Sequence, residues 1–150
     1  MTDIYSYIKS DHQKVDDLFN QVLSTNDLVK RQKLFETIKR ELILHAASEN
    51  ATFYSALEEH PEIRKVIEHG EEEHEVIKNY IIKLDQLGVA NEEWITEFKK
   101  LKNEVTAHVK EEEGKFFKIA KDILSKKSEA ELGKEMENVK KDLKKKFPQL

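Results

Sequence analysis

The stretch Leu44-His45-Ala46-Ala47-Ser48-Glu49 places a histidine and a glutamate four residues apart, and the same spacing returns in His108-Val109-Lys110-Glu111-Glu112. Four residues are close to one turn of an α-helix, so in each copy the two side chains share one face. An imidazole nitrogen and a carboxylate oxygen on one face can reach the same metal ion. Two copies, each inside an apolar stripe, predict a helical protein built around a pair of metal ions.

The composition fits a single helical domain. The chain has 150 residues with only four glycines and two prolines, and 38% of its residues are hydrophobic while 37% are charged. These proportions supply a core and argue against disorder. The net charge of -4 gives no support to a nucleic-acid partner, which would favour a basic face.

The absence of cysteine limits the chemistry that the chain can carry. Disulfides, thiolate ligands and thiol catalysis are excluded because the sequence contains no cysteine, so metal ligands must be nitrogen and oxygen. The first residues lack the order of a signal peptide, and no apolar run approaches the roughly 18 residues of a membrane span. We therefore expect a soluble cytoplasmic protein with no membrane partner.

Apolar residues at helical spacing predict four long helices, over about residues 3–23, 28–58, 61–87 and 91–123. Asn26 or Asp27 can cap the second helix, Pro61 is a favoured first position for the third, and Gly88 is an end signal. Asn91 can start the fourth. The predicted bundle spans residues 1–126.

Residues 127–150 predict a short amphipathic helix packed on the bundle or extending from it. Ser128 and Glu131 fit a capping box, and Pro148 would end the helix. We expect its lysine run, residues 144–146, to be a solvated face rather than a binding patch. Its apolar edge comprises Leu132, Met136, Val139, Leu143 and Phe147.

Histidines interrupt the apolar stripe of each long helix. If consecutive helices are antiparallel, His12, His45, His74 and His108 each lie roughly 14 to 19 residues from the adjoining turns, and thus in one layer. A single histidine on an apolar stripe is more often a hydrogen-bonded core residue. Burying four imidazoles and two carboxylates without partners, however, would cost several kcal/mol per charged group. A metal pair removes that cost.

Imidazole and carboxylate ligands without sulfur suit iron or manganese, with zinc as a further possibility. Four histidines and two glutamates do not saturate two octahedral ions. Open positions remain for a solvent bridge and for dioxygen, peroxide or nitric oxide.

Taken in order, Asp11-His12, His45 to Glu49, Glu71-Glu72-Glu73-His74 and His108 to Glu112 resemble the hemerythrin-like, or HHE cation-binding, family. The resemblance covers about residues 3–124. It implies an all-α fold, an up-down-up-down antiparallel four-helix bundle, around two iron ions with an oxo or hydroxo bridge. Glu49 and Glu112 would be the bridging carboxylates, with His12 and His45 on one iron and His74 and His108 on the other.

One position departs from the oxygen-carrying hemerythrins, which have a further histidine where this chain has Gly70. The resemblance is therefore closer to the bacterial branch with four histidines and two glutamates. Gly70 either relieves crowding or leaves space for a ligand beside the iron. We expect Glu71 and Glu73 to be surface carboxylates rather than substitute ligands. Four other residues are also expected to face away from the core, namely His60, His69, Glu111 and Glu113.

The function that follows is that of a non-heme di-iron protein that binds or reacts with a small ligand, in sensing or detoxification under oxidative or nitrosative stress. A peroxide- or oxygen-reducing oxidoreductase is the enzymatic alternative. Iron-centre repair, iron storage or delivery, and a metal-stabilised interaction module rank lower. We expect a monomer or a weak dimer.

Overall fold

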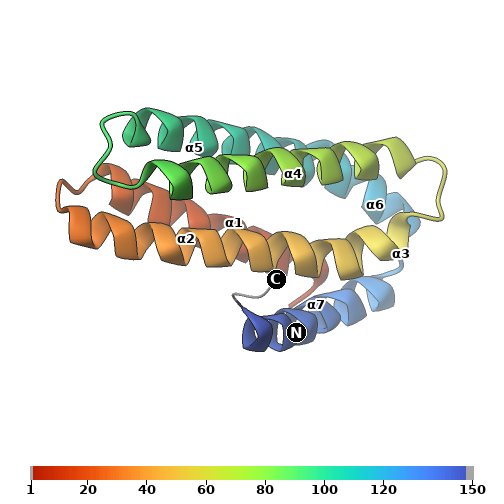
Figure 1. Cartoon of the computed structure of the whole chain (residues 1–150). Helices are drawn as coiled ribbons and strands as arrows, with labels where there is room; N and C mark the ends of the chain where they lie inside the picture. Colours follow the sequence, from red (N-terminus) through yellow and green to blue (C-terminus); the bar gives the residue numbers. More distant parts are fainter. Residues whose placement is uncertain (1, 148–150) are drawn as a thin grey trace.

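The computed structural model describes residues 2–147, and these form an all-helical up-down-up-down bundle with one extra C-terminal helix, as expected (Figure 1). The helical hairpin of α1 and α2 faces the hairpin of α4 and α5, and α7 lies outside the first hairpin. The bundle has four long helical rods, namely α1, α2 to α3, α4, and α5 to α6. The second and the fourth rod each contain a π-helical turn. The elements are α1 (Ile4–Leu23), α2 (Leu28–Glu49), η1 (Asn50–Tyr54), α3 (Ser55–Leu57), α4 (Arg64–Leu87), α5 (Trp94–Glu111), η2 (Glu112–Phe116), α6 (Phe117–Ile123) and α7 (Lys126–Lys146).

Polar side chains and one glycine fix the ends of several helices. The Asp3 carboxylate accepts from the backbone N–H of Ser6 at the start of α1. The Asp27 carboxylate accepts from the N–H groups of Val29 and Lys30, which makes Asp27 rather than Asn26 the cap of α2. Gly88 ends α4 with φ 77°, a backbone conformation that favours glycine.

Three predicted helix starts are wrong. α5 begins at Trp94 and not at Asn91, because residues 91–93 form a turn in which the Asn91 side chain accepts from the Glu93 N–H. α4 begins at Arg64 and not at Pro61, because the preceding residues turn so that Ile63 enters the core with no exposed surface. α7 begins at Lys126 and not at Ser128, because the Ser125 side chain accepts from the Ser128 N–H and is the actual cap. The predicted stop at Pro148 lies outside the described residues. The division of the chain at residues 126 and 127 stays a prediction.

The core consists of two apolar clusters with a polar layer between them. One cluster lies toward the α3 and α6 ends of the rods and includes Ile8, Phe53 and Phe116. The other lies toward the opposite end and includes Val15 and Trp94. The helices therefore carry a polar cross-section at mid-length, enclosed by apolar packing on both sides.

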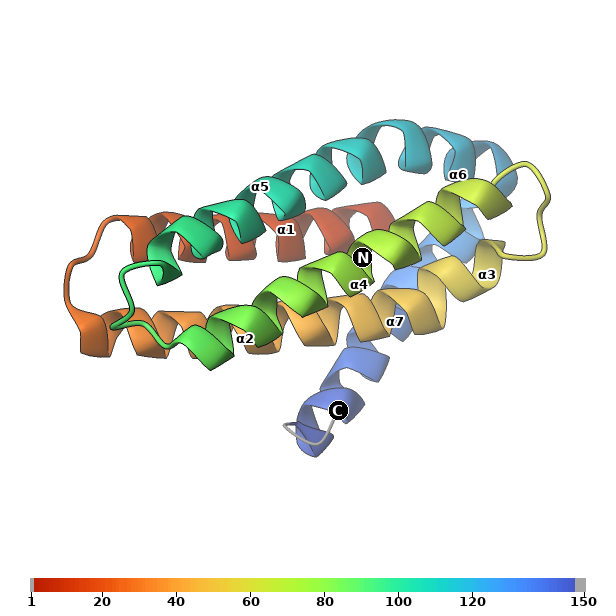
Figure 2. The same ribbon diagram turned by 45° about the horizontal axis from the view of Figure 1, so that its top comes forward.

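The helix α7 runs obliquely across the outside of α1 and α2 (Figure 2). Leu132 and Met136 join the first apolar cluster. Gly133 lets the backbones approach closely, because a Cβ there would stand only 2.4 Å from the carbonyl oxygen of Thr2. Residues 144–146 are exposed lysines, as predicted.

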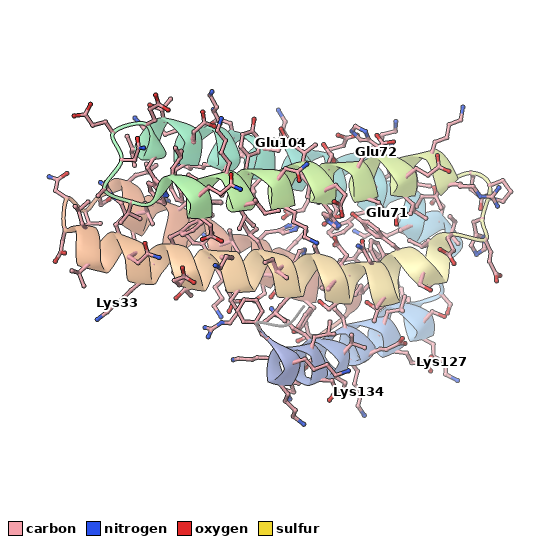
Figure 3. The ribbon with its side chains drawn as sticks, viewed as in Figure 1. Lys33, Glu71, Glu72, Glu104, Lys127 and Lys134 are labelled. Atoms are coloured by element: carbon pink, nitrogen blue, oxygen red, sulfur yellow. The ribbon has the colours of Figure 1, made fainter. Side chains whose placement is uncertain are left out.

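The outer surface is charged, and side chains such as Lys33, Glu72 and Lys127 extend into solvent (Figure 3). Among the residues that the structure describes, no helix is both long and apolar enough to cross a membrane.

Candidate metal centre

The polar layer brings all six predicted ligand residues together. They come from four rods: His12 from α1, His45 and Glu49 from α2, His74 from α4, and His108 and Glu112 from α5 and the start of η2. The ring centroids of His12 and His45 lie 5.1 Å apart, and those of His74 and His108 lie 4.9 Å apart. The four histidines thus form two facing pairs.

The two carboxylates lie between the histidine pairs and belong to both. Two groups of candidate ligand atoms each lie within 4.8 Å of one another. One group comes from His12, His45, Glu49 and Glu112, and the other comes from His74, His108 and the same two glutamates. Such overlap is the arrangement that two adjacent cations sharing two carboxylates require.

Each glutamate reaches across to the opposite hairpin. The Glu49 carboxylate lies 3.6 Å from Nε2 of His45 on its own helix and 3.1 Å from Nε2 of His74. The Glu112 carboxylate lies 3.5 Å from Nε2 of His108 and 3.2 Å from Nε2 of His12. The carboxylates therefore connect the two halves of the bundle.

The outward nitrogen of every histidine is held by an oxygen. Nδ1 of His12 donates to Glu113 (2.6 Å), and Nδ1 of His45 donates to Asp11 (2.7 Å). In the other hairpin, Nδ1 of His74 donates to Asn50 (3.1 Å) and Nδ1 of His108 donates to Glu73 (2.8 Å). In a neutral imidazole the proton is then on Nδ1, so the lone pair is on Nε2 and points inward. This orientation is the one that a metal-binding histidine needs.

The inward atoms have no hydrogen-bond partner within the described part of the chain. The buried unpartnered atoms of the layer are Nε2 of all four histidines, both carboxylate oxygens of Glu49 and Oε1 of Glu112. An unsatisfied buried polar atom costs on the order of 1–3 kcal/mol, so seven together are unusual. A cation pair would satisfy all seven, and the residues therefore fit a metal centre.

The electrostatics of the layer also favour positive charge. Burial alone would lower the pKa of His45 and His108, but the carboxylates of Glu49 and Asp11, and of Glu112 and Glu73, raise each pKa to about 10. Burial would raise the pKa of Glu112, but its contacts with His108 and His12 hold that pKa well below the usual range.

Tyr54 occupies the space that Gly70 leaves. A Cβ on Gly70 would stand 2.6 Å from the Tyr54 hydroxyl oxygen. The hydroxyl donates to Oε2 of Glu112 at 2.7 Å, and the ring stacks on His74 at 5.4 Å and 2°. Of the two readings of Gly70, relief of crowding matches this arrangement, since an aromatic ring fills the position.

A π-helical turn follows each HxxxE pair. η1 begins directly after Glu49, and η2 begins at Glu112. Adjacent residues of a regular α-helix point about 100° apart. The wider turn allows two consecutive aromatic residues to enter the core in both rods, namely Phe53 with Tyr54 and Phe116 with Phe117. Such turns are frequent at functional sites.

The contacts that hold Nδ1 of each histidine were not predicted from the sequence. Glu73 and Glu113 were expected to face away from the core, yet both are half-buried and accept from histidines of the polar layer. The sequence carries a signal for them that the spacing of histidines alone misses. Each hairpin has an acidic residue before its first histidine, and an Asn or Glu directly after the glutamate of its HxxxE pair.

Two histidines lie outside the centre. His60 and His69 have side chains that are 43% and 51% exposed, as predicted. His69 lies near Glu73 and Glu111 at the surface, with carboxylate contacts of 3.5 and 3.4 Å. Neither histidine contributes to the polar layer.

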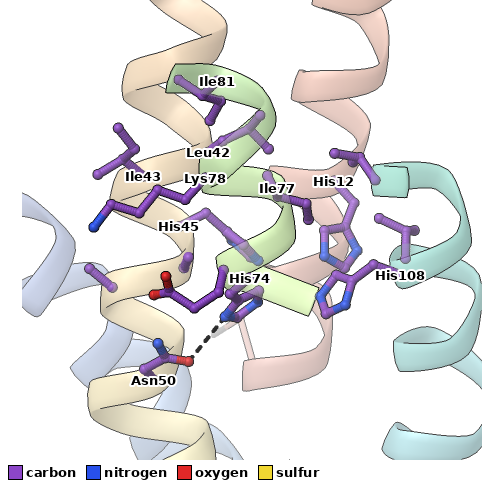
Figure 4. A pocket seen from close by; sticks show the side chains of 15 residues that line it. His12, Leu42, Ile43, His45, Asn50, His74, Ile77, Lys78, Ile81 and His108 are labelled. Carbon is purple, nitrogen blue, oxygen red and sulfur yellow. Dashed lines mark hydrogen bonds between the residues drawn. The ribbon is translucent and has the colours of Figure 1, made fainter. Parts of the chain in front are cut away.

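A cavity of about 300 Å³ opens onto the four histidines (Figure 4). It lies among α1, α2, α4 and α5, and Glu75 and Lys78, both exposed, line its outer part. Aliphatic side chains form most of the remaining wall: Leu42, Ile43, Ile77, Ile81, Val105 and Val109. A small neutral molecule can therefore approach the centre through apolar surroundings.

Comparison with known proteins agrees with this geometry. The family described as "Hemerythrin HHE cation binding domain" matches residues 3–120. A crystal structure of an HHE cation-binding domain-containing protein from Mycobacterium kansasii superposes with a TM-score of 0.82 at 21% identity, covering 95% of this chain and 87% of the other. A protein of Nostoc sp. named as a DNA nickase is 27% identical over 127 residues, 81% of this chain. The matched region is 34% of that relative's length.

Proposed function

Because the chain belongs to the hemerythrin HHE cation-binding family, we propose that its polar layer binds two iron ions and takes up dioxygen, peroxide or nitric oxide. The observation that carries this proposal is the set of seven buried, unpartnered atoms that face one another. Nitrogen and oxygen donors without sulfur suit iron, with manganese and zinc as less favoured alternatives.

His12 and His45 would hold one ion, His74 and His108 the other, and Glu49 and Glu112 would bridge both. The protein supplies two imidazoles to each ion and shares two carboxylates, which leaves coordination positions free on both. Iron bound there would supply reversible electron transfer and open positions for a small ligand. A purely structural site tends to be coordinatively closed, so this donor set favours a reactive centre.

The surrounding residues orient the donors and select what reaches them. Asp11, Glu73, Glu113 and Asn50 fix the imidazole rings through Nδ1. The Tyr54 hydroxyl donates to Glu112 and keeps that carboxylate turned toward the layer. The aliphatic walls of the cavity favour small neutral ligands over charged ones.

Two roles remain for such a centre, and both use the same residues. A stable, reversible ligand adduct would make the protein a sensor or carrier, whereas rapid consumption of peroxide or oxygen would make it an oxidoreductase. We favour sensing or detoxification under oxidative or nitrosative stress. We do not extend DNA cleavage to this chain, because the match covers about a third of the nickase and the chain carries a net charge of -4.

The test is the metal content per chain after anaerobic reconstitution with ferrous iron, followed by the visible spectrum on adding air and then peroxide. We expect two irons per chain and a visible charge-transfer band. His74→Ala and Glu49→Ala should each lose metal, because each removes inward donors of the layer.

His60→Ala is the matched control, since it removes a half-exposed histidine outside the layer, and it should retain both irons. Retention of two irons by both ligand variants would disprove the assignment. One tightly held zinc in place of iron would indicate a structural role.

A further inference from the structure

The two halves of the centre differ in their contact with α7. Asp11 and Glu73 have equivalent positions, because each directly precedes the first histidine of its hairpin. Asp11 accepts from Nδ1 of His45, and Glu73 accepts from Nδ1 of His108. Glu73 has only the half-exposed His69 as a further histidine contact. Asp11 instead binds a half-buried cation, because Lys140 of α7 donates to its other carboxylate oxygen at 2.7 Å.

Lys140 is enclosed on several sides. Its side chain is 15% exposed, its Nζ lies 3.6 Å from the buried carboxylate of Glu41, and it stands 5.7 Å from the ring centroid of Tyr7. Holding a lysine in such a place requires α7 to be docked on α1 and α2. The ammonium group therefore has one defined position only when α7 is in contact with the bundle.

An unbroken chain of contacts runs from α7 to the centre. Lys140 binds Oδ1 of Asp11, Oδ2 of Asp11 accepts from Nδ1 of His45, and Nε2 of His45 faces the layer. A carboxylate with both oxygens engaged is fixed in rotation, and it fixes the imidazole in turn. Partners that orient a ligand histidine typically change metal affinity 10–100-fold when they are removed.

We propose that Lys140 is a positioning residue for His45, and that α7 docking and cation occupancy of the His12–His45 position thereby stabilise each other. The inference rests on the proposed metal centre. Because coupling between two binding events is reciprocal, loss of Lys140 should weaken metal binding, and metal binding should hold α7 more firmly against the bundle.

The direct test is stepwise titration of the full chain with ferrous iron under anaerobic conditions, measured by calorimetry. Lys140→Met keeps the length of the side chain and removes its charge. It should weaken one of the two binding steps about tenfold, the low end of the range for groups that orient a ligand. The other binding step should be unchanged. Lys140→Arg keeps the charge and should restore most of the affinity.

Lys141→Met is the matched control, because Lys141 lies on the same helix, is 68% exposed and pairs only with Glu137 among the described residues. It should bind iron as the wild type does. In a His45→Ala background, Lys140→Met should have no further effect, since the histidine through which it acts is gone.

Hydrogen exchange of residues 126–147 gives a readout that does not depend on activity. Loading with iron should slow exchange in α7 about tenfold in the wild type and not in Lys140→Met. If the wild type binds two irons and Lys140→Met is unchanged in both measurements, the inference is wrong while the metal centre stands. If the effect persists in His45→Ala, Lys140 acts on general stability and the inference is also wrong. A wild-type chain that takes up no iron would overturn both proposals.

Discussion

At the scale of single residues, Gly70 and Tyr54 share one space beside the centre. The missing Cβ of Gly70 makes room for the Tyr54 hydroxyl, which binds Glu112. A glycine inside a helix is destabilising by about 1 kcal/mol relative to alanine. The glycine in α4 carries that cost, and Tyr54, which occupies the space, contacts both Glu112 and His74.

Gly70→Ala should therefore destabilise the metal-free protein by about 1–3 kcal/mol, the usual range for overpacking, despite the better helix propensity of alanine. In a Tyr54→Leu background, which lacks the hydroxyl and the nearest ring atoms, the same substitution should stabilise by about 0.5–1 kcal/mol. Urea unfolding of the four proteins measures both effects. If Gly70→Ala changes the unfolding free energy with the same sign in both backgrounds, Tyr54 is not what excludes a side chain at Gly70.

The six inward residues could be predicted from the sequence because HxxxE spacing and apolar stripes together fix a helix face. Their supporting residues could not be predicted from helical spacing. Glu73 stands in a run of three glutamates and Glu113 in another, and only a comparison of the two hairpins, position by position, indicates which member of each run meets a histidine. That depends on the rotation of each helix and on the neighbour it faces, neither of which periodicity determines.

At the scale of elements, the two π-helical turns determine how the residues after Glu49 and Glu112 face the core. The sequence predicted continuous helices through residues 28–58 and 91–123, and the structure is helical without a break over most of both ranges but widens each into a π-helical turn at the centre. A π turn adds one residue without changing the apolar content of the segment, so counting hydrophobic positions does not detect it. Two adjacent aromatic residues, both buried in each rod, are the sequence feature that accompanies the π turn.

Deleting Ala51, an exposed residue inside η1, should convert the wide turn to a regular one. The helix beyond the turn would keep its direction, but Phe53 and Tyr54 would then point about 100° apart, as adjacent residues of a regular α-helix do, so that both could not remain buried. We expect a loss of more than about 3 kcal/mol of unfolding free energy, the scale for removing a large core side chain, measured by urea denaturation.

Ala51→Gln tests the same position without changing the length of the chain. It should alter stability by no more than about 0.5 kcal/mol, as exposed substitutions usually do. A deletion variant as stable as Ala51→Gln would mean that the π turn is not required for packing.

At the scale of the whole molecule, the centre lies where the two hairpins meet, between two apolar clusters. Each hairpin supplies three of the six inward residues, and Glu49 and Glu112 reach across to histidines of the opposite hairpin. Ions bound there would join the hairpins at mid-length, where the packing is polar and contributes least by itself.

Removing the metal should therefore lower the thermal stability of the entire bundle. Each ion present at about 100 times its dissociation constant adds about 2.7 kcal/mol, so two ions add about 5 kcal/mol. For a chain of this size that corresponds to a Tm difference of about 10–20 °C, measured by circular dichroism before and after chelation. His60→Ala should show the same difference. A Tm that stays constant after chelation has removed all metal would contradict a role of the ions in joining the hairpins.

The correspondence of the two hairpins extends beyond the ligands. Each carries an acidic residue followed by histidine, then a second histidine, a glutamate four residues later, an Asn or Glu, and a π turn with two aromatic residues. Two identical hairpins facing each other would assemble the same centre. Gly70 and the α7 contact of Asp11 are the points at which the hairpins depart from this internal twofold correspondence.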